Sequence, residues 1–176
     1  VHIRQPKDAI REGLAFLTED RKGQGLVLSQ PVQTNLILAS MRLFRRGPFL
    51  RRAQIRDNSE RRVHSLRIKT PTIDEVVAQL SGGNQQKVVI GKWINTEADV
   101  YIFDEPTRGI DVGAKWEIYG IINELAAQGK AVILISSELP EVLGMSDRVL
   151  VVKDDAIVAE LTGDEINAVE VMRYAL

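Results

Sequence analysis

The chain has 176 residues, 44% of them hydrophobic and 27% charged, so it suits one globular domain or a piece of a larger one. It contains no cysteine, which excludes disulfide bonds and thiolate metal sites. The longest apolar runs are too short to span a bilayer and the first residues lack a signal-peptide pattern, so we expect any membrane role to come through a partner.

The net charge is only −1, yet the basic residues cluster in one segment. Between residues 41 and 70, only Asp57 and Glu60 interrupt a series of basic side chains: Arg42, Arg45, Arg46, Arg51, Arg52, Arg56, Arg61, Arg62, Arg67 and Lys69. Such a segment could contact nucleic acid or anionic lipid headgroups. A solvated helical face is the simpler interpretation, because base stacking needs aromatic side chains and the segment has only Phe44 and Phe49.

In chain order, the first half is expected to be mostly helical. A short buried strand over residues 14–18 leads into a charged, glycine-containing loop at 21–25. Apolar residues at helical spacing predict a helix from Pro31 to about Met41, and Gly47-Pro48 then breaks the pattern. A second, polar helix is predicted over residues 51–66.

The second half alternates helices and strands. The predicted elements are a helix over 82–95, a strand over 100–103, a helix over 114–126, a strand over 131–135, a short helix over 141–145, and a hairpin of 148–152 with 157–161. We expect Trp93 and Trp116 to pack in the core. Alternation of this kind indicates an α/β layered fold, in which ligands gather at the carboxyl ends of the strands.

The stretch Leu80-Ser-Gly-Gly-Asn-Gln-Gln-Lys87 has the character of a phosphate-binding loop at a helix N-terminus. Ser81 can present a hydroxyl, and the amides of Gly82 and Gly83 lie bare to an anion that the helix dipole also attracts. The alternative is an ordinary serine N-cap with a glycine hinge. The usual P-loop, GxxxxGK[ST], does not occur anywhere in the chain.

Asp104 and Glu105 close the apolar strand predicted over 100–103. An acid at this position can hold the metal of a Mg²⁺-nucleotide, and the adjacent Glu can orient or deprotonate an attacking water. Taken alone the pair is a weak signal, because acids also end strands simply to reach solvent. Its value comes from the glycine loop about twenty residues earlier and from Asp111 shortly after.

This combination resembles the ATP-binding-cassette (ABC) ATPases. Residues 80–87 are similar to their signature motif, residues 101–105 to their Walker B strand, and Gly109-Ile110-Asp111 to their D-loop. The wording of residues 18–22, 104–115 and 136–148 resembles more narrowly the second nucleotide-binding half of the tandem ATPases that drive bacterial simple-sugar importers, of the ribose, galactose, xylose and arabinose type.

The resemblance implies an α/β fold, a partial ABC ATPase cassette with a RecA-like parallel sheet core and an inserted α-helical subdomain. Residues 1–25 would start the core, 26–95 would form the helical subdomain with the signature motif, and 96–176 would complete the core. The P-loop would lie upstream of Val1. The substrate would be ATP with Mg²⁺ as cofactor.

The same resemblance assigns roles to individual residues. The signature loop would act in trans, on the γ-phosphate of ATP held by another cassette, through Ser81, Gly82, Gly83 and Gln85. Asp111 would contact the nucleotide from the D-loop. Asp104 would hold Mg²⁺ and Glu105 would be the catalytic base.

Two positions depart from the family pattern. Glu19 stands where these ATPases usually have a metal-linked Gln, and Ser137 stands where they usually have a switch His. A carboxylate near triphosphate repels it unless a cation intervenes, and Ser cannot carry the charge of an imidazolium. We therefore expect an asymmetric pair of sites, in which the site using Glu105 is slow or mainly structural.

The expected partners follow from the family. They are a second cassette, in the same full-length chain, membrane permease subunits, and indirectly a periplasmic sugar-binding protein, at the cytoplasmic face of the bacterial inner membrane. No nucleic-acid partner is expected. The alternatives are a non-transport ABC ATPase acting on nucleic acid or ribosomes, and a non-hydrolytic binding module. The sugar cannot be read from this chain.

Overall fold

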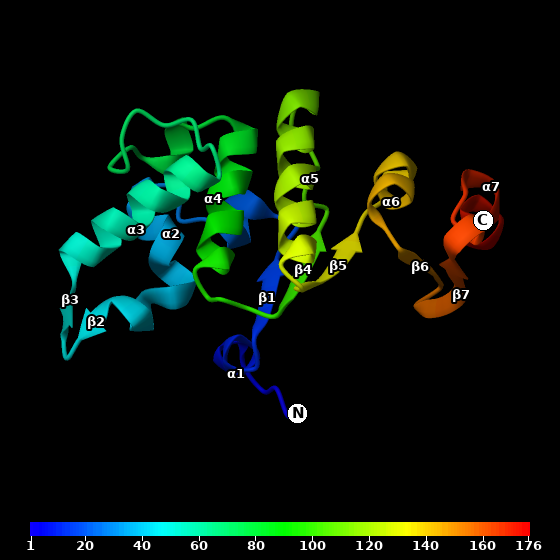
Figure 1. Ribbon diagram of the computed structural model, residues 1–176, viewed down its shortest axis with the longest axis horizontal. Helices are drawn as coiled ribbons and strands as arrows, with labels where there is room; N and C mark the ends of the chain where they lie inside the picture. The colour runs from blue at the N-terminus through cyan, green and yellow to red at the C-terminus, as the bar shows by residue number, and fades with distance from the viewer. The chain divides into compact units, whose positions relative to one another are not determined.

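A computed structural model describes residues 1–176, which divide into two compact units, residues 1–133 and residues 134–176 (Figure 1). No helix in it is both long enough and apolar enough to cross a membrane. Each unit is described by itself.

The sheet of the first unit is built on two parallel strands, β1 (Leu14–Leu17) and β4 (Val100–Asp104). Leu14 pairs with Val100 and Leu17 pairs with Phe103. Strand β5 (Ala131–Ile135) follows β4 in the order β1-β4-β5. The strands are those predicted from the apolar runs. Because β1 and β4 are parallel, the residues that follow them, including Glu19 and Glu105, come to the same edge of the sheet.

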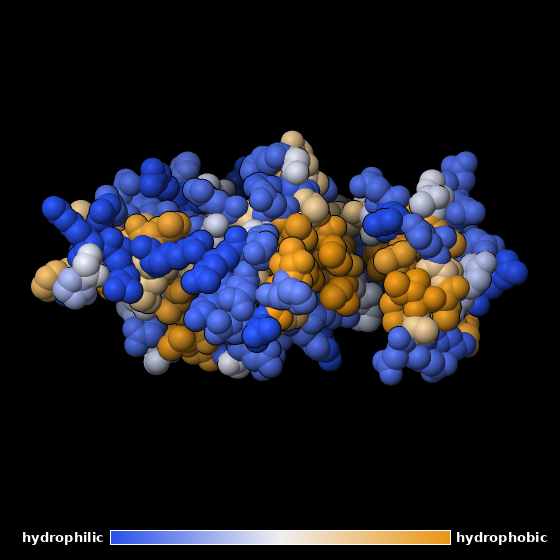
Figure 2. All heavy atoms as spheres, turned by 90° about the horizontal axis from the view of Figure 1, so that it is seen from below, coloured by the Kyte–Doolittle hydropathy of each residue, from blue (hydrophilic) through white to orange (hydrophobic).

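One face of β1 and β4 is buried and the other is more open. Ala15, Leu17, Tyr101 and Phe103 alternate along the two strands and are at most 2% exposed. Phe16 lies between Ala15 and Leu17, points to the opposite face, and is 44% exposed. On the face of the molecule that Figure 2 shows, apolar side chains gather in patches among hydrophilic ones.

Helices α4 (Gly82–Ile94) and α5 (Val112–Ala127) of the first unit pack against each other (Figure 1). Helix α4 also packs against β1. The buried face of α5 contains Ile118, Ile121, Ile122 and Leu125, as its spacing predicts. The expectation that Trp116 lies in the core is wrong. Trp116 is 71% exposed because it sits two residues from Ile118, on the other side of the helix.

The region between β1 and α4 is helical, as predicted. It contains α2 (Val32–Ile37), a 3-10 turn η2 (Leu38–Phe44) and α3 (Arg52–Ser65), with α2 packing against both α3 and α4. The helix predicted from Pro31 to Met41 therefore exists but tightens into a 3-10 turn after Ile37. The predicted loop over 21–25 is a single π-helical turn, η1 (Arg21–Gly25), capped by the Asp20 side chain.

Several short elements of the first unit were not predicted. Helix α1 (Pro6–Arg11) precedes β1, and η3 (Val77–Gln79) precedes the signature loop. A small hairpin pairs β2 (Arg45–Arg46) with β3 (Phe49–Leu50). Gly47, with a φ of 60°, allows the turn between them.

The second unit is a hairpin packed against a helix. Strands β6 (Arg148–Lys153) and β7 (Ala156–Thr162) are antiparallel, as predicted, and the turn places Asp154 and Asp155 in the left-handed region. The remaining elements are α6 (Leu139–Met145), η4 (Gly163–Glu165) and α7 (Ala168–Ala175). The core is formed by Val149, Val151, Leu161 and Val171.

Candidate functional site

The signature loop, residues 80–87, contains the first turn of α4. Ser81 is the N-cap residue, with extended backbone angles, and it is exposed. Its side chain makes no capping hydrogen bond to the helix. The first N–H groups of α4 therefore have no side-chain cap. A helix N-terminus in this state, with its positive dipole end, suits a negatively charged ligand.

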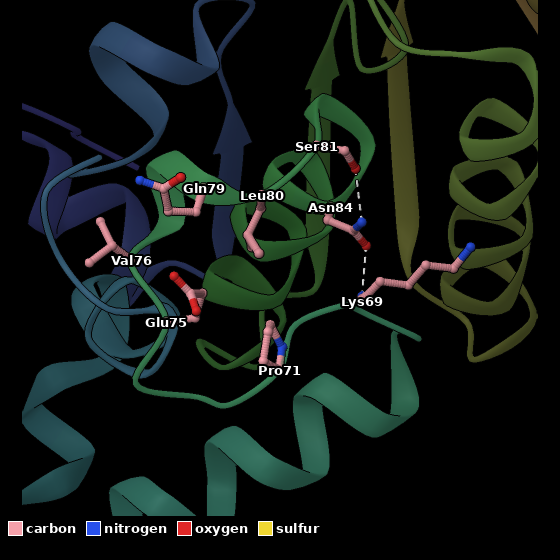
Figure 3. Close-up of a pocket in the computed structure, with 8 residues that line it drawn as sticks. All are labelled: Lys69, Pro71, Glu75, Val76, Gln79, Leu80, Ser81 and Asn84. Atoms are coloured by element: carbon pink, nitrogen blue, oxygen red, sulfur yellow. Dashed lines mark hydrogen bonds between the residues drawn. The ribbon is translucent and has the colours of Figure 1, made fainter.

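Asn84 is a residue of this site that sequence reasoning missed. Its Nδ2 donates a hydrogen bond of 2.9 Å to Ser81 Oγ, and its Oδ1 accepts one of 2.8 Å from the backbone N–H of Lys69 (Figure 3). All three residues line a pocket of about 590 Å³. The only sequence signal was a polar side chain three residues after the N-cap, a spacing that brings both to one side of the helix.

The two glycines of the loop have different neighbours. A Cβ atom built on Gly83 would lie 2.4 Å from the Cβ of Ala114, so Gly83 allows α4 and α5 to pack closely. A Cβ on Gly82 would lie 2.7 Å from an Nη atom of Arg21. The structure thus adds a packing role for Gly83 and a cationic neighbour for Gly82.

Arg21 is a second residue that sequence reasoning missed. Besides its contact with Gly82, it donates a hydrogen bond of 3.1 Å from Nη1 to the carbonyl oxygen of Arg108, and its Nε is buried without a partner. The guanidinium therefore joins the turn after β1 to the segment after β4, and it brings a positive charge to the signature loop.

Asp111 caps the N-terminus of α5. Its carboxylate accepts a hydrogen bond of 2.9 Å from the N–H of Ala114, and its Oδ2 lies 3.9 Å from the position of a Cβ on Gly83. The structure therefore brings Asp111, at the position that resembles the D-loop, next to the signature loop.

The acidic residues predicted at the carboxyl ends of β1 and β4 lie at or just after these strand ends. Asp104 is the last residue of β4 and is half-buried. Glu105 follows with a φ of 46°, a left-handed conformation that is uncommon for a residue with a side chain and recurs at functional sites. Glu19, after β1, forms an ion pair with Arg108. The structure contains no group of three or more His, Cys, Asp or Glu side chains placed to hold a metal ion.

Gln85 and Ser137 are placed differently from the other predicted residues. Gln85 is only 4% exposed, and its amide donates to the carbonyl of Val77 at 3.2 Å. It is therefore not at the surface beside Ser81. Ser137 follows β5 and belongs to the second unit.

Lys87, at the end of the signature loop, is buried and holds α4 against its surroundings. Its ammonium donates to the Arg67 carbonyl and to the Glu117 carboxylate of α5, the latter at 2.8 Å. This hydrogen bond lowers the pKa of Glu117. Both ends of the motif are thus fixed, Lys87 by an ion pair and Ser81 by Asn84.

The sequence model of the ABC transporter family matches residues 4–108 of this chain. The chain belongs to that family. Solved structures agree in fold: a nucleotide-free ATP-binding cassette from an ABC transporter superimposes with a TM-score of 0.76 at 20% identity, covering 97% of this chain and 68% of that one. A dimeric post-hydrolysis cassette, MJ0796 bound to ADP and Pi, has a TM-score of 0.73 at 18% identity, covering 90% of this chain and 68% of that one.

Among curated relatives, the putative ribose/galactose/methyl galactoside import ATP-binding protein 1 of Burkholderia lata is 50% identical over 99% of this chain. The ribose import ATP-binding protein RbsA of Geobacillus kaustophilus is 51% identical, also over 99%. The chain spans 34% and 35% of these two relatives, about a third of each. The predicted α/β cassette fold and the resemblance to sugar-importer ATPases are both confirmed.

Proposed function

We propose that this chain is part of an ATP-hydrolysing subunit that drives import of a simple sugar. The observation that carries the proposal is the sequence identity of 50–51%, over 99% of the chain, to relatives named as ribose or ribose/galactose/methyl galactoside import ATP-binding proteins. The partners would be a second cassette and membrane permease subunits, with a periplasmic sugar-binding protein acting through the permease at the cytoplasmic face of the inner membrane.

In this proposal the signature loop receives the γ-phosphate of ATP held by the other cassette. Three features support an anion there: the uncapped N-terminus of α4, the exposed hydroxyl of Ser81, and the guanidinium of Arg21 beside Gly82. The acidic side chain of Asp111 lies beside Gly83, and the N-terminus of α5, which it caps, partly neutralises its charge.

Glu105 would orient and deprotonate the water that attacks the γ-phosphate, and Asp104 would be the protein ligand of Mg²⁺. The fit is chemical: Mg²⁺ commonly takes only one or two carboxylates, with phosphates and water as its other ligands, so a single half-buried Asp at a strand end is adequate. Bound there, Mg²⁺ would neutralise charge on the phosphates. The chain's own contribution is to hold Glu105 at the end of β4.

Glu19 and Arg108 bear on the proposed asymmetry between the two sites. The ion pair gives the Glu19 carboxylate a counter-charge from the protein, so that Glu19 need not face the triphosphate unneutralised. A paired Glu19 would be a poor substitute for the metal-linked Gln of other cassettes. We therefore propose that the site using Glu105 is the slower of the two.

The test uses the full-length protein assembled with its permease, comparing the variants Glu105→Gln and Ser81→Arg. We expect Ser81→Arg to lower ATP turnover by about 100-fold or more, because the new side chain would fill the γ-phosphate position of the faster of the two sites. We expect Glu105→Gln to retain most of the turnover, although loss of a catalytic base usually costs about 10²–10⁴-fold. If Glu105→Gln abolishes turnover and Ser81→Arg does not, the asymmetry has the opposite sense.

The rival function is an ABC ATPase acting on nucleic acid or ribosomes. The observation that favours it is the hairpin of β2 and β3, which exposes Phe49 (74%) among arginines. Salt-dependent binding of RNA or DNA would support this rival. Co-purification of the full-length protein with a membrane permease would oppose it.

A further inference from the structure

We propose that Asn84 is a positioning residue that turns the Ser81 hydroxyl outward as a hydrogen-bond donor to the γ-phosphate. The inference rests on the proposed function, because it concerns the same phosphate. It goes further by stating which partner fixes the proton of Ser81, and by assigning this task to a side chain that lies inside α4.

The first step is the orientation of the Asn84 amide. A backbone N–H can only donate, so the 2.8 Å contact from Lys69 N must reach the oxygen of the carboxamide. The NH₂ group is then the one that faces Ser81, at 2.9 Å from Oγ. The choice between the two amide orientations is therefore made by the main chain, not by the hydroxyl.

The second step is the orientation of the Ser81 hydroxyl. An NH₂ group can only donate, so Ser81 Oγ must accept and its own proton points elsewhere. The structure gives that proton no acceptor in the chain, and the side chain does not cap the helix. Ser81 is exposed at the N-terminus of α4, and we infer that its proton is free to point into the space that a phosphate would enter.

The third step is rigidity. Asn84 is 9% exposed, so its carboxamide competes little with water for these two bonds. The Lys69 amide is held in place by its neighbours, because Leu66 and Ile68 are buried at 6% and 5% exposure and the Ile68 N–H is bonded to the Val63 carbonyl. The donor direction of Ser81 is thus set before any ligand arrives, which lowers the cost of binding.

The test variant is Asn84→Asp in the full-length protein with its permease. Aspartate has nearly the same shape, and it can still accept from Lys69, but its second oxygen is an acceptor. Ser81 must then donate inward, and its lone pairs face the phosphate. We expect kcat/KM for ATP to fall about 10- to 100-fold, the range for one hydrogen bond to a charged group. Affinity for ADP, which has no γ-phosphate, should change less than 3-fold.

The negative charge that Asn84→Asp adds is separated from the effect on the hydroxyl by a double-mutant cycle with Ser81→Ala. Without a hydroxyl there is nothing to misorient, so Asn84→Asp should cost less than about 3-fold in the Ser81→Ala background. Lowering the pH should also restore part of the Asn84→Asp activity, because a protonated carboxyl can again donate to Ser81. Asn167→Asp, at the N-cap of α7 where either residue caps well, is the matched control and should behave as wild type.

The outcomes are distinct. An equal cost of Asn84→Asp in the wild-type background and in the Ser81→Ala background would overturn the positioning role while leaving the phosphate site intact. A larger loss for Asn84→Ala than for Asn84→Asp would also overturn it, because a structural role depends on volume and bonds rather than on donor direction. If Ser81→Ala alone leaves ATP turnover unchanged, the failure lies in the proposed function of the signature loop.

Discussion

Lys92 is a buried lysine that the proposed reaction does not use. It is 8% exposed, and its ammonium donates a hydrogen bond of 2.6 Å to the Gly25 carbonyl and lies 5.2 Å from the ring centroid of Trp93. Burial disfavours the charged form and lowers the pKa of Lys92 from its ordinary value of 10.5 to about 8. At the residue scale, Lys92 fixes the end of the π-helical turn to α4 at a cost in desolvation.

This cost predicts a pH dependence of stability. Between pH 8 and 10.5 the unfolded chain keeps a proton that the folded chain has released, so the free energy of unfolding should rise with pH in this window. The rise should be at most about 3 kcal/mol. Urea unfolding of wild type and Lys92→Met at several pH values measures it. The variant should lack this slope, whereas Lys22→Met, at an exposed lysine, should keep it.

At the scale of elements, the contact between α4 and α5 depends on one missing methyl group. Gly83 begins the buried part of α4, and the Cβ of Ala114 in α5 occupies the space that a side chain at Gly83 would need. Asp111 starts α5 at the same point, and Lys87 joins the helices by its ion pair with Glu117 one turn further along α4. The signature loop and the D-loop are therefore positioned by a single helix–helix contact.

We expect Gly83→Ala to lower the free energy of unfolding by about 1–3 kcal/mol, because the new Cβ overpacks against Ala114. The second change Ala114→Gly should remove the clash, so the double variant should differ from Ala114→Gly alone by less than about 1 kcal/mol. Thermal unfolding of the four proteins measures this cycle. Additive losses would show that Ala114 is not what excludes a side chain at Gly83.

At the scale of the whole molecule, the chain contains one face of each proposed site rather than a complete one. It carries the signature loop and the strand end with Asp104 and Glu105, while the sequence holds no GxxxxGK[ST] motif. The curated relatives are about three times as long as this chain. Under the proposed function, the phosphates that these residues serve would be held by residues elsewhere in the full-length assembly.

We therefore expect the 176-residue chain by itself to bind ATP weakly and to hydrolyse it at a negligible rate. Mg-ATP turnover and equilibrium dialysis with ATP, each compared with the full-length protein, provide the measurement. Turnover by the isolated chain close to that of the full-length protein would contradict the division of the site between cassettes.

Local pattern predicted the elements well where it was strong. The helix expected over 82–95 is α4, and the strand expected over 100–103 is β4, because each has a clear apolar period and a glycine or acidic boundary. The weaker patterns failed in part. The helix expected to Met41 tightens after Ile37, and the hairpin of β2 and β3 has strands of two residues each, too short to show a period.

The sequence by itself determined the class of protein, because the motif residues 80–87 and 104–111 have fixed local spacing and carry their chemistry in residue type. Tertiary structure alone decided how those residues are held. The bonds of Arg21 to the Arg108 carbonyl and of Lys69 to Asn84 join positions 87 and 15 residues apart. Such partners are chosen by the packing of α4 against its neighbours, which no local period encodes, and so the orientation of the Ser81 hydroxyl became readable only in the folded chain.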